Sequence, residues 1–195
     1  MAIILASTSS IRRRLLENAG VAFTSEKPPV NEGELKSLSP TLGPEAMAQH
    51  LAAAKCMSVS ARHPDDFVIG ADQVLSFAGK TYDKPENLAE AKSHLLEFSG
   101  KTHTLISAVC CARGGAVLWH YSDRAELTMR PFSDRFLENY LAAVGGDATT
   151  SVGAYKLEGP GIQLFEGIKG DYFTILGLPL LPLLAFLRSV DGIGR

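Results

Sequence analysis

Short apolar runs alternate with amphipathic stretches of helical length from the start of the chain. Residues 2–6 form an apolar run that is too short for a helix, and the hydroxyl cluster at 7–10 ends it, which predicts a buried strand. Residues 11–19 place apolar side chains on one helical face, and Gly20 ends this second segment. A brief strand is expected at 21–25. The chain therefore opens with a strand–helix–strand pattern.

The rest of the chain continues this mixture. Residues 27–44 contain four prolines and few apolar side chains, which predicts a long loop, and long loops are more often functional than idle. Gly114-Gly115 predicts a hairpin between two long strands. Helices are expected at about 44–61, 87–98, 133–144 and 179–190, and strands at 67–71, 102–112, 116–129, 153–157 and 171–175. The pattern predicts an α/β fold, a mixed twisted sheet with flanking helices, in one domain over residues 1–195.

Composition narrows the class of protein. The 195 residues are 46% hydrophobic and 21% charged, which is typical of a globular chain and excludes a disordered one. The net charge of -2 disfavours a stable nucleic-acid partner, and no apolar run is long enough for a membrane span. Cys56, Cys110 and Cys111 cannot all pair, which favours reduced thiols and a cytoplasmic location.

The turn between the first strand and the first helix is a candidate phosphate site. Helix starts expose unpaired N–H groups and a partial positive charge. Arg12 and Arg13 in the first turn oppose that charge unless an anion binds. Alternatively, one arginine pairs with Glu17 and the others are solvated. The turn lacks the spacing of a P-loop.

Charged residues elsewhere in the chain indicate a functional site only when several of them occur together. Asp72 follows the apolar run at 67–71, at the sheet edge where α/β proteins place ligands, and can orient a water or hold Mg²⁺; alternatively it begins a turn. Lys55 and Lys84 can bind phosphate, or they lie on the surface. Glu32 is a metal candidate if Asp72 lies near it, and otherwise a solvated loop residue.

In combination, these motifs resemble the Maf family of nucleoside triphosphate pyrophosphatases. The resemblance runs from about residue 3 to residue 188, nearly the whole chain. It implies an α/β sheet split into two lobes that enclose a substrate cleft, as in Maf and Ham1 proteins, and usually a homodimer. The matching segments are 5–16, 70–74, 84–85, 99–103, 153–159, 170–172 and 177–180.

The resemblance implies hydrolysis of a nucleoside triphosphate between its α and β phosphates, to give a monophosphate and pyrophosphate. By position, Asp72 is similar to the family's general base. With Glu32 it would hold a divalent cation, Mg²⁺ or Mn²⁺. The residues expected to bind the triphosphate are Ser7, Ser9, Arg13, Lys55 and Lys84.

Three further positions bear on which nucleobase the substrate carries. Gln73 and Glu158 are similar to the branch of the family that acts on 7-methyl-GTP, and a carboxylate at 158 could accept from the N–H edge of guanine. Ile11 departs from that branch, which usually has Trp there. The branch that prefers dTTP and UTP typically has Arg, Thr and Gln at these three positions. The resemblance thus favours a house-cleaning pyrophosphatase for modified nucleotides such as 7-methyl-GTP.

Other functions stay open at this stage. A dTTP/UTP pyrophosphatase of the same family is the nearest alternative. A regulator of septum formation that acts by binding would not need Asp72. Nucleic-acid binding through residues 12–14 would show a steep salt dependence, and the net charge disfavours it.

Overall fold

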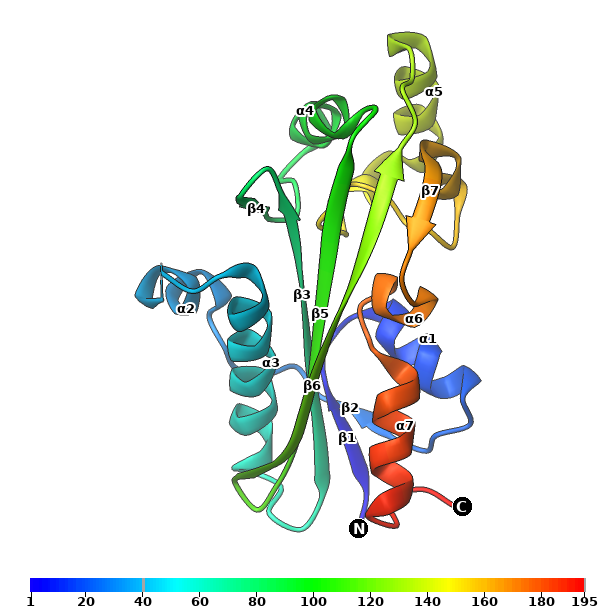
Figure 1. Cartoon of the computed structure of the whole chain (residues 1–195). Coiled ribbons are helices and arrows are strands. Elements are labelled where there is room, and N and C mark those ends of the chain that lie inside the picture. Colours follow the sequence, from blue (N-terminus) through cyan, green and yellow to red (C-terminus); the bar gives the residue numbers. More distant parts are fainter. Residues whose placement is uncertain (40, 195) are drawn as a thin grey trace. The chain divides into compact units, whose positions relative to one another are not determined.

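Figure 1 shows a computed structural model of the chain, which describes residues 1–39 and 41–194. The strands are β1 (Ile3–Ala6), β2 (Thr24–Ser25), β3 (Phe67–Phe77), β4 (Lys80–Tyr82), β5 (Thr102–Arg113), β6 (Ala116–Met129) and β7 (Phe165–Lys169). The helices are α1 (Ser10–Asn18), α2 (Glu32–Leu38), α3 (Pro44–Ser60), α4 (Leu88–Phe98), α5 (Asp134–Val144), α6 (Tyr172–Ile175) and α7 (Leu180–Ser189), with 3₁₀ turns at Gly145–Thr149 and Pro160–Leu164.

Over the described residues the strands form a seven-stranded mixed sheet. Their order is β2-β1-β3-β5-β6-β7, and β4 pairs with β3. The predicted α/β class with a mixed sheet and flanking helices is confirmed. In this part of the chain, no helix is long and apolar enough to cross a membrane.

The chain divides into two compact units. The first contains residues 1–73, 106–123 and the C-terminal segment from Tyr172; the second contains 74–105 and 124–171. Strands β3, β5 and β6 contribute residues to both. The family match described below spans both units, and a single domain over 1–195 stays a prediction.

The first unit is built on parallel strands. β1 pairs in parallel with β2 and with β3, in the register that places Ile4 beside Thr24 and Val68. All four residues of β1 are buried, as parallel strands covered on both faces require. Helix α3 lies on one side of these strands, and α1 and α7 lie on the other (Figure 1).

The second unit has antiparallel pairing and an aromatic core. β7 pairs with the end of β6, and β4 pairs with the end of β3. His103 on β5 stacks on Phe98 of α4, and its Nε2 lies 2.7 Å from the Tyr155 hydroxyl. Burial lowers the pKa of His103 from its ordinary value to about 4. This histidine therefore belongs to the core of the unit.

Several predicted elements differ from the structure. The segment expected to be a loop at 27–44 contains helix α2, which Asn31 caps by accepting from the Glu34 N–H at 3.2 Å. Residues expected as a strand at 171–175 form helix α6, and those at 153–157 form turns. Local capping and turn contacts determine the secondary structure of these segments. Each segment is too short to show a periodic pattern of apolar residues.

We predict that His103 makes the stability of the protein depend on pH. The unfolded histidine titrates near its ordinary value of 6.5 and the folded one near 4, so its contribution is complete above pH 6.5 and is lost as the pH falls towards 4. The free energy of unfolding should drop by about 3 kcal/mol across that window. Urea unfolding of wild type and of His103→Gln, repeated at several pH values in that window, measures this drop. If the free energy of unfolding falls equally steeply with decreasing pH in both proteins, His103 is not the cause of the pH dependence.

Candidate active site

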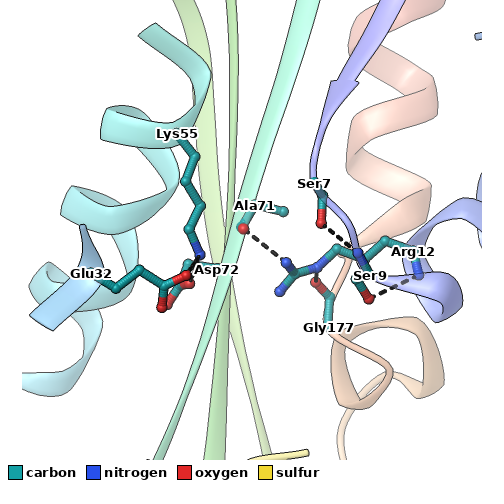
Figure 2. A network of polar contacts seen from close by, with 8 residues as sticks. All are labelled: Ser7, Ser9, Arg12, Glu32, Lys55, Ala71, Asp72 and Gly177. Carbon is teal, nitrogen blue, oxygen red and sulfur yellow. Dashed lines mark hydrogen bonds and ion pairs between the residues drawn. The ribbon is translucent and has the colours of Figure 1, made fainter. Parts of the chain in front are cut away.

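The turn between β1 and α1 is held by its own hydroxyl groups. The Ser7 hydroxyl oxygen accepts from the Ser9 N–H at 3.1 Å, and the Ser9 hydroxyl oxygen caps α1 by accepting from the Arg12 N–H at 3.4 Å (Figure 2). The first turn of this helix contains no acidic side chain. The predicted helix start after the hydroxyl cluster is confirmed, with Ser9 as the cap, and its phosphate role stays a prediction.

Arg12 points into the protein at this turn. Its Nε donates to the Gly177 carbonyl at 2.8 Å and its Nη1 donates to the Ala71 carbonyl at 2.9 Å (Figure 2). The side chain thereby links α1 to the middle of β3 and to the loop before α7. Burial lowers the pKa of Arg12, while the nearby Asp72 and Glu32 carboxylates favour its charged form.

The family resemblance points to the neighbouring arginine, Arg13, as a ligand of the triphosphate. Arg13 is exposed, and its side chain has no hydrogen bond or ion pair with any residue in the described part of the chain. A signal for Arg12 was present in the sequence. Leu16 lies four residues further along the same helix and is fully buried, so helical spacing alone places Arg12 on the buried face.

Lys55 joins two carboxylates. Its Nζ lies 2.5 Å from Asp72 Oδ1 and 2.8 Å from Glu32 Oε1. Figure 2 shows the three side chains converging from α3, β3 and α2. Lys55 and Asp72 are buried, whereas the Glu32 side chain is half exposed. The structure therefore brings together three of the predicted site residues.

The environment of Asp72 suits proton transfer. Burial raises the pKa of its carboxyl group above the ordinary value, although the Lys55 and Arg12 charges oppose the shift. A carboxylate whose pKa moves towards neutrality becomes a stronger base. The direction of this shift is the one that a general base needs, and the role of Asp72 as the base stays a prediction.

The two carboxylates also fit a divalent cation. Asp72 and Glu32 both form an ion pair with Lys55 Nζ, so the two carboxylates already share one positive charge. Mg²⁺ is usually held by one or two carboxylates together with waters and substrate phosphates, not by an all-protein cage. The described residues contain no group of three or more acidic, His or Cys side chains able to hold a metal, and a cation on the two carboxylates stays a prediction.

The remaining predicted residues fall into both units. Gln73 and Ile11 are half-buried residues of the first unit, and the Gln73 Nε2 donates to the Ile175 carbonyl at 2.9 Å. Lys84 and Glu158 are exposed residues of the second unit. The candidate site in the first unit comprises Ser7, Ser9, Arg12, Arg13, Glu32, Lys55, Asp72 and Gln73. The roles of these residues, like those of Lys84 and Glu158, stay predictions.

Gly70 lets α3 approach β3 closely enough for Lys55 to reach Asp72. A Cβ at this position would lie 2.4 Å from the Ala52 carbonyl oxygen and 2.6 Å from the Cys56 N, both backbone atoms of α3. No side-chain rearrangement can relieve such a contact. Glycine at this strand position therefore sets the helix–strand distance at the site.

Comparison with known proteins places this α/β chain in a family. Residues 2–190 match the family described as "Maf-like protein", and the chain belongs to the Maf family. A "7-methyl-GTP pyrophosphatase" of Rhizobium etli is 49% identical over 195 residues, 97% of this chain and 98% of that protein. A "Nucleoside triphosphate pyrophosphatase" of Granulibacter bethesdensis is 49% identical over 191 residues, 97% of each chain. A solved HAM1 protein from Coxiella burnetii shares 14% identity and a TM-score of 0.41, covering 66% of this chain and 73% of its own.

We predict that Gly70→Ala destabilises the first unit. The added methyl group must push α3 from the strand, and overpacking of this kind costs about 1–3 kcal/mol in unfolding free energy. Chemical denaturation measures the change. Gly146→Ala is the matched control, because a Cβ there meets nothing within 4 Å. A Gly70→Ala protein as stable as wild type would show that the helix does not approach the strand this closely.

Proposed function

We propose that this protein is a nucleoside triphosphate pyrophosphatase that releases pyrophosphate and a nucleoside monophosphate. The observation that carries the proposal is the pair of carboxylates, Asp72 and Glu32, held on Lys55 within a Maf-family chain. The names of the two relatives support the same reaction. Anhydride hydrolysis needs a base for water and positive charge for the leaving group, and the site offers both.

The bond changes follow from that arrangement. A water oxygen attacks the α-phosphorus, its proton passes to the Asp72 carboxylate, and the bond between the α-phosphorus and the bridging oxygen breaks. The electron pair of that bond leaves with pyrophosphate. Lys55 keeps Asp72 oriented through its 2.5 Å contact, so that the carboxylate is in place before the substrate binds.

Positive charge for the triphosphate comes from several groups. The exposed Arg13 lies in the first turn of α1, where the helix start also attracts anions. Lys55 and, by resemblance, Lys84 add point charges. A Mg²⁺ or Mn²⁺ ion held by Asp72 and Glu32 would supply Lewis acidity that stabilises negative charge on the phosphate oxygens.

We also propose that the substrate carries a 7-methylguanine base, because this chain shares residues with the 7-methyl-GTP branch. Gln73 and Glu158 are the two positions that match this branch, and the relative from Rhizobium etli carries that name. Ile11 cannot stack on the base as Trp would. A preference for dTTP or UTP would keep the reaction and exclude this base assignment.

We predict that Asp72→Asn loses at least about 100-fold in kcat, because the amide cannot accept a proton. Pyrophosphate release from 7-methyl-GTP, GTP, UTP and dTTP, with Mg²⁺ or Mn²⁺ and with EDTA, measures the reaction, its substrate and its metal requirement. Asp65→Asn is the matched control, since Asp65 is an exposed acidic residue of the same unit. Undiminished release by Asp72→Asn would remove Asp72 from the reaction.

We also predict the pH dependence. Protonated Asp72 cannot act as a base, and burial raises its pKa, so kcat/KM should fall on the acid side at a midpoint above the ordinary Asp value of 3.8. Lys55→Met removes a charge that favours the carboxylate, which should move this midpoint to still higher pH. Lys92→Met, at an exposed ion pair with Glu138, should leave it in place. A midpoint that Lys55→Met does not move would argue against Asp72 as the titrating group.

A further inference from the structure

Lys55 contacts the same two carboxylates that a divalent cation would use. Its Nζ lies 2.5 Å from Asp72 Oδ1 and 2.8 Å from Glu32 Oε1, and Figure 2 shows it between the two groups. An ammonium group has three N–H donors and no acceptor, so it satisfies carboxylate oxygens much as a small cation does. Lys55 and a divalent cation therefore compete for one pair of carboxylates.

The charges around Asp72 already balance. Lys55 and Arg12 supply two positive charges, Asp72 and Glu32 supply two negative ones, and Asp72 interacts electrostatically with the other three groups. Lys55 and Asp72 are both less than one-tenth exposed, so salt and water screen their charges only weakly. A dication added while Lys55 stays in place would leave two positive charges uncompensated, which is costly in a buried site.

The two positive groups differ in how they are held. Arg12 donates to the Gly177 carbonyl at 2.8 Å and to the Ala71 carbonyl at 2.9 Å, so the backbone of two segments fixes its guanidinium group. Lys55 Nζ contacts the side chains of Asp72 and Glu32, and its four-carbon stem can rotate to a new partner. Lys55 is therefore the movable positive charge of the site.

The Glu32 side of the pair is open to solvent. The Glu32 side chain is 50% exposed, whereas the side chains of Lys55 and Asp72 are 9% and 8% exposed. Helix α2, which begins at Glu32, contains no buried residue. A cation and a triphosphate can thus reach the carboxylates from the α2 side, and the ammonium group can turn towards that side, without disturbing the core.

We propose that Lys55 is the counter-ion of Asp72 and Glu32 until a divalent cation displaces it, and that its ammonium group then binds a phosphate group of the substrate. The inference rests on the proposed function and adds an exchange of partners at its site. Lys55 serves the carboxylates before the cation binds and the triphosphate afterwards. The negative charge of the triphosphate compensates the positive charge that the cation adds.

Binding of Mn²⁺ without nucleotide tests the competition. Lys55→Met removes the competing charge, so its dissociation constant for Mn²⁺ should be at least about tenfold lower than that of wild type. Electron paramagnetic resonance of free Mn²⁺ measures the binding without turnover. Lys55→Gln keeps a hydrogen-bond donor near Asp72 and is the second variant in case Lys55→Met does not fold. Lys92→Met, at an exposed ion pair with Glu138, should bind Mn²⁺ as wild type does.

Chemical labelling of wild type separates displacement from coexistence. A cation that binds beside Lys55 would also bind more tightly once the lysine charge is removed, so the variants alone do not decide. Displacement moves the Lys55 ammonium group out of its buried position, and saturating Mn²⁺ should therefore raise its acetylation by acetic anhydride, read by mass spectrometry. Lys92, whose side chain is 39% exposed, is the internal reference. Unchanged labelling of Lys55 at saturation would overturn the inference.

The outcomes keep the inference distinct from the proposed reaction. If the Lys55 variants gain affinity for Mn²⁺ and Mn²⁺ exposes Lys55, but no nucleotide is hydrolysed, the inference stands and the reaction fails. If wild type releases pyrophosphate but binds Mn²⁺ as tightly as the folded Lys55 variants do, the reaction stands and the inference fails. Failure of wild type and variants alike to bind Mn²⁺ also overturns the inference.

Discussion

The ion pair between Lys55 and Asp72 is the interaction on which the arrangement of the site depends. Both side chains are less than one-tenth exposed, and their charged atoms lie 2.5 Å apart. Removing one partner of such a pair typically costs about 3–5 kcal/mol, because the other charge is left buried. The pair also requires α3 to lie almost in contact with β3, which only glycine at position 70 allows. Gly70, Lys55 and Asp72 therefore act as one structural unit.

Much of the fold could be predicted from the sequence because its main elements have clear periods and end signals. The hairpin around Gly114-Gly115 and the helices α1, α3 and α5 were predicted to within a few residues. Several of the short elements could not be predicted. β7 pairs with β6 far along the chain, and α2 follows a proline-rich segment in which local composition favoured a loop.

The candidate site was predictable in its residues but not in its contacts. Family motifs selected Asp72, Lys55 and Glu32, and the structure brings these three together. Which arginine of the cluster at 12–14 points inward depends on the helical face, and the resemblance alone pointed to Arg13. The partners of Gln73 could not be read from the sequence, because two of them are backbone carbonyls of α6, about one hundred residues away.

Asp72 and Gln73 are neighbours on β3, so their side chains leave opposite faces of the strand. Asp72 meets Lys55 of α3, whereas Gln73 meets the carbonyls of α6 and lies close to Arg12. The two side chains therefore lie on different sides of one strand, each in contact with a different helix. Because the two side chains share a backbone but no hydrogen-bond partner, a substitution at position 73 leaves the charge pair at position 72 in place.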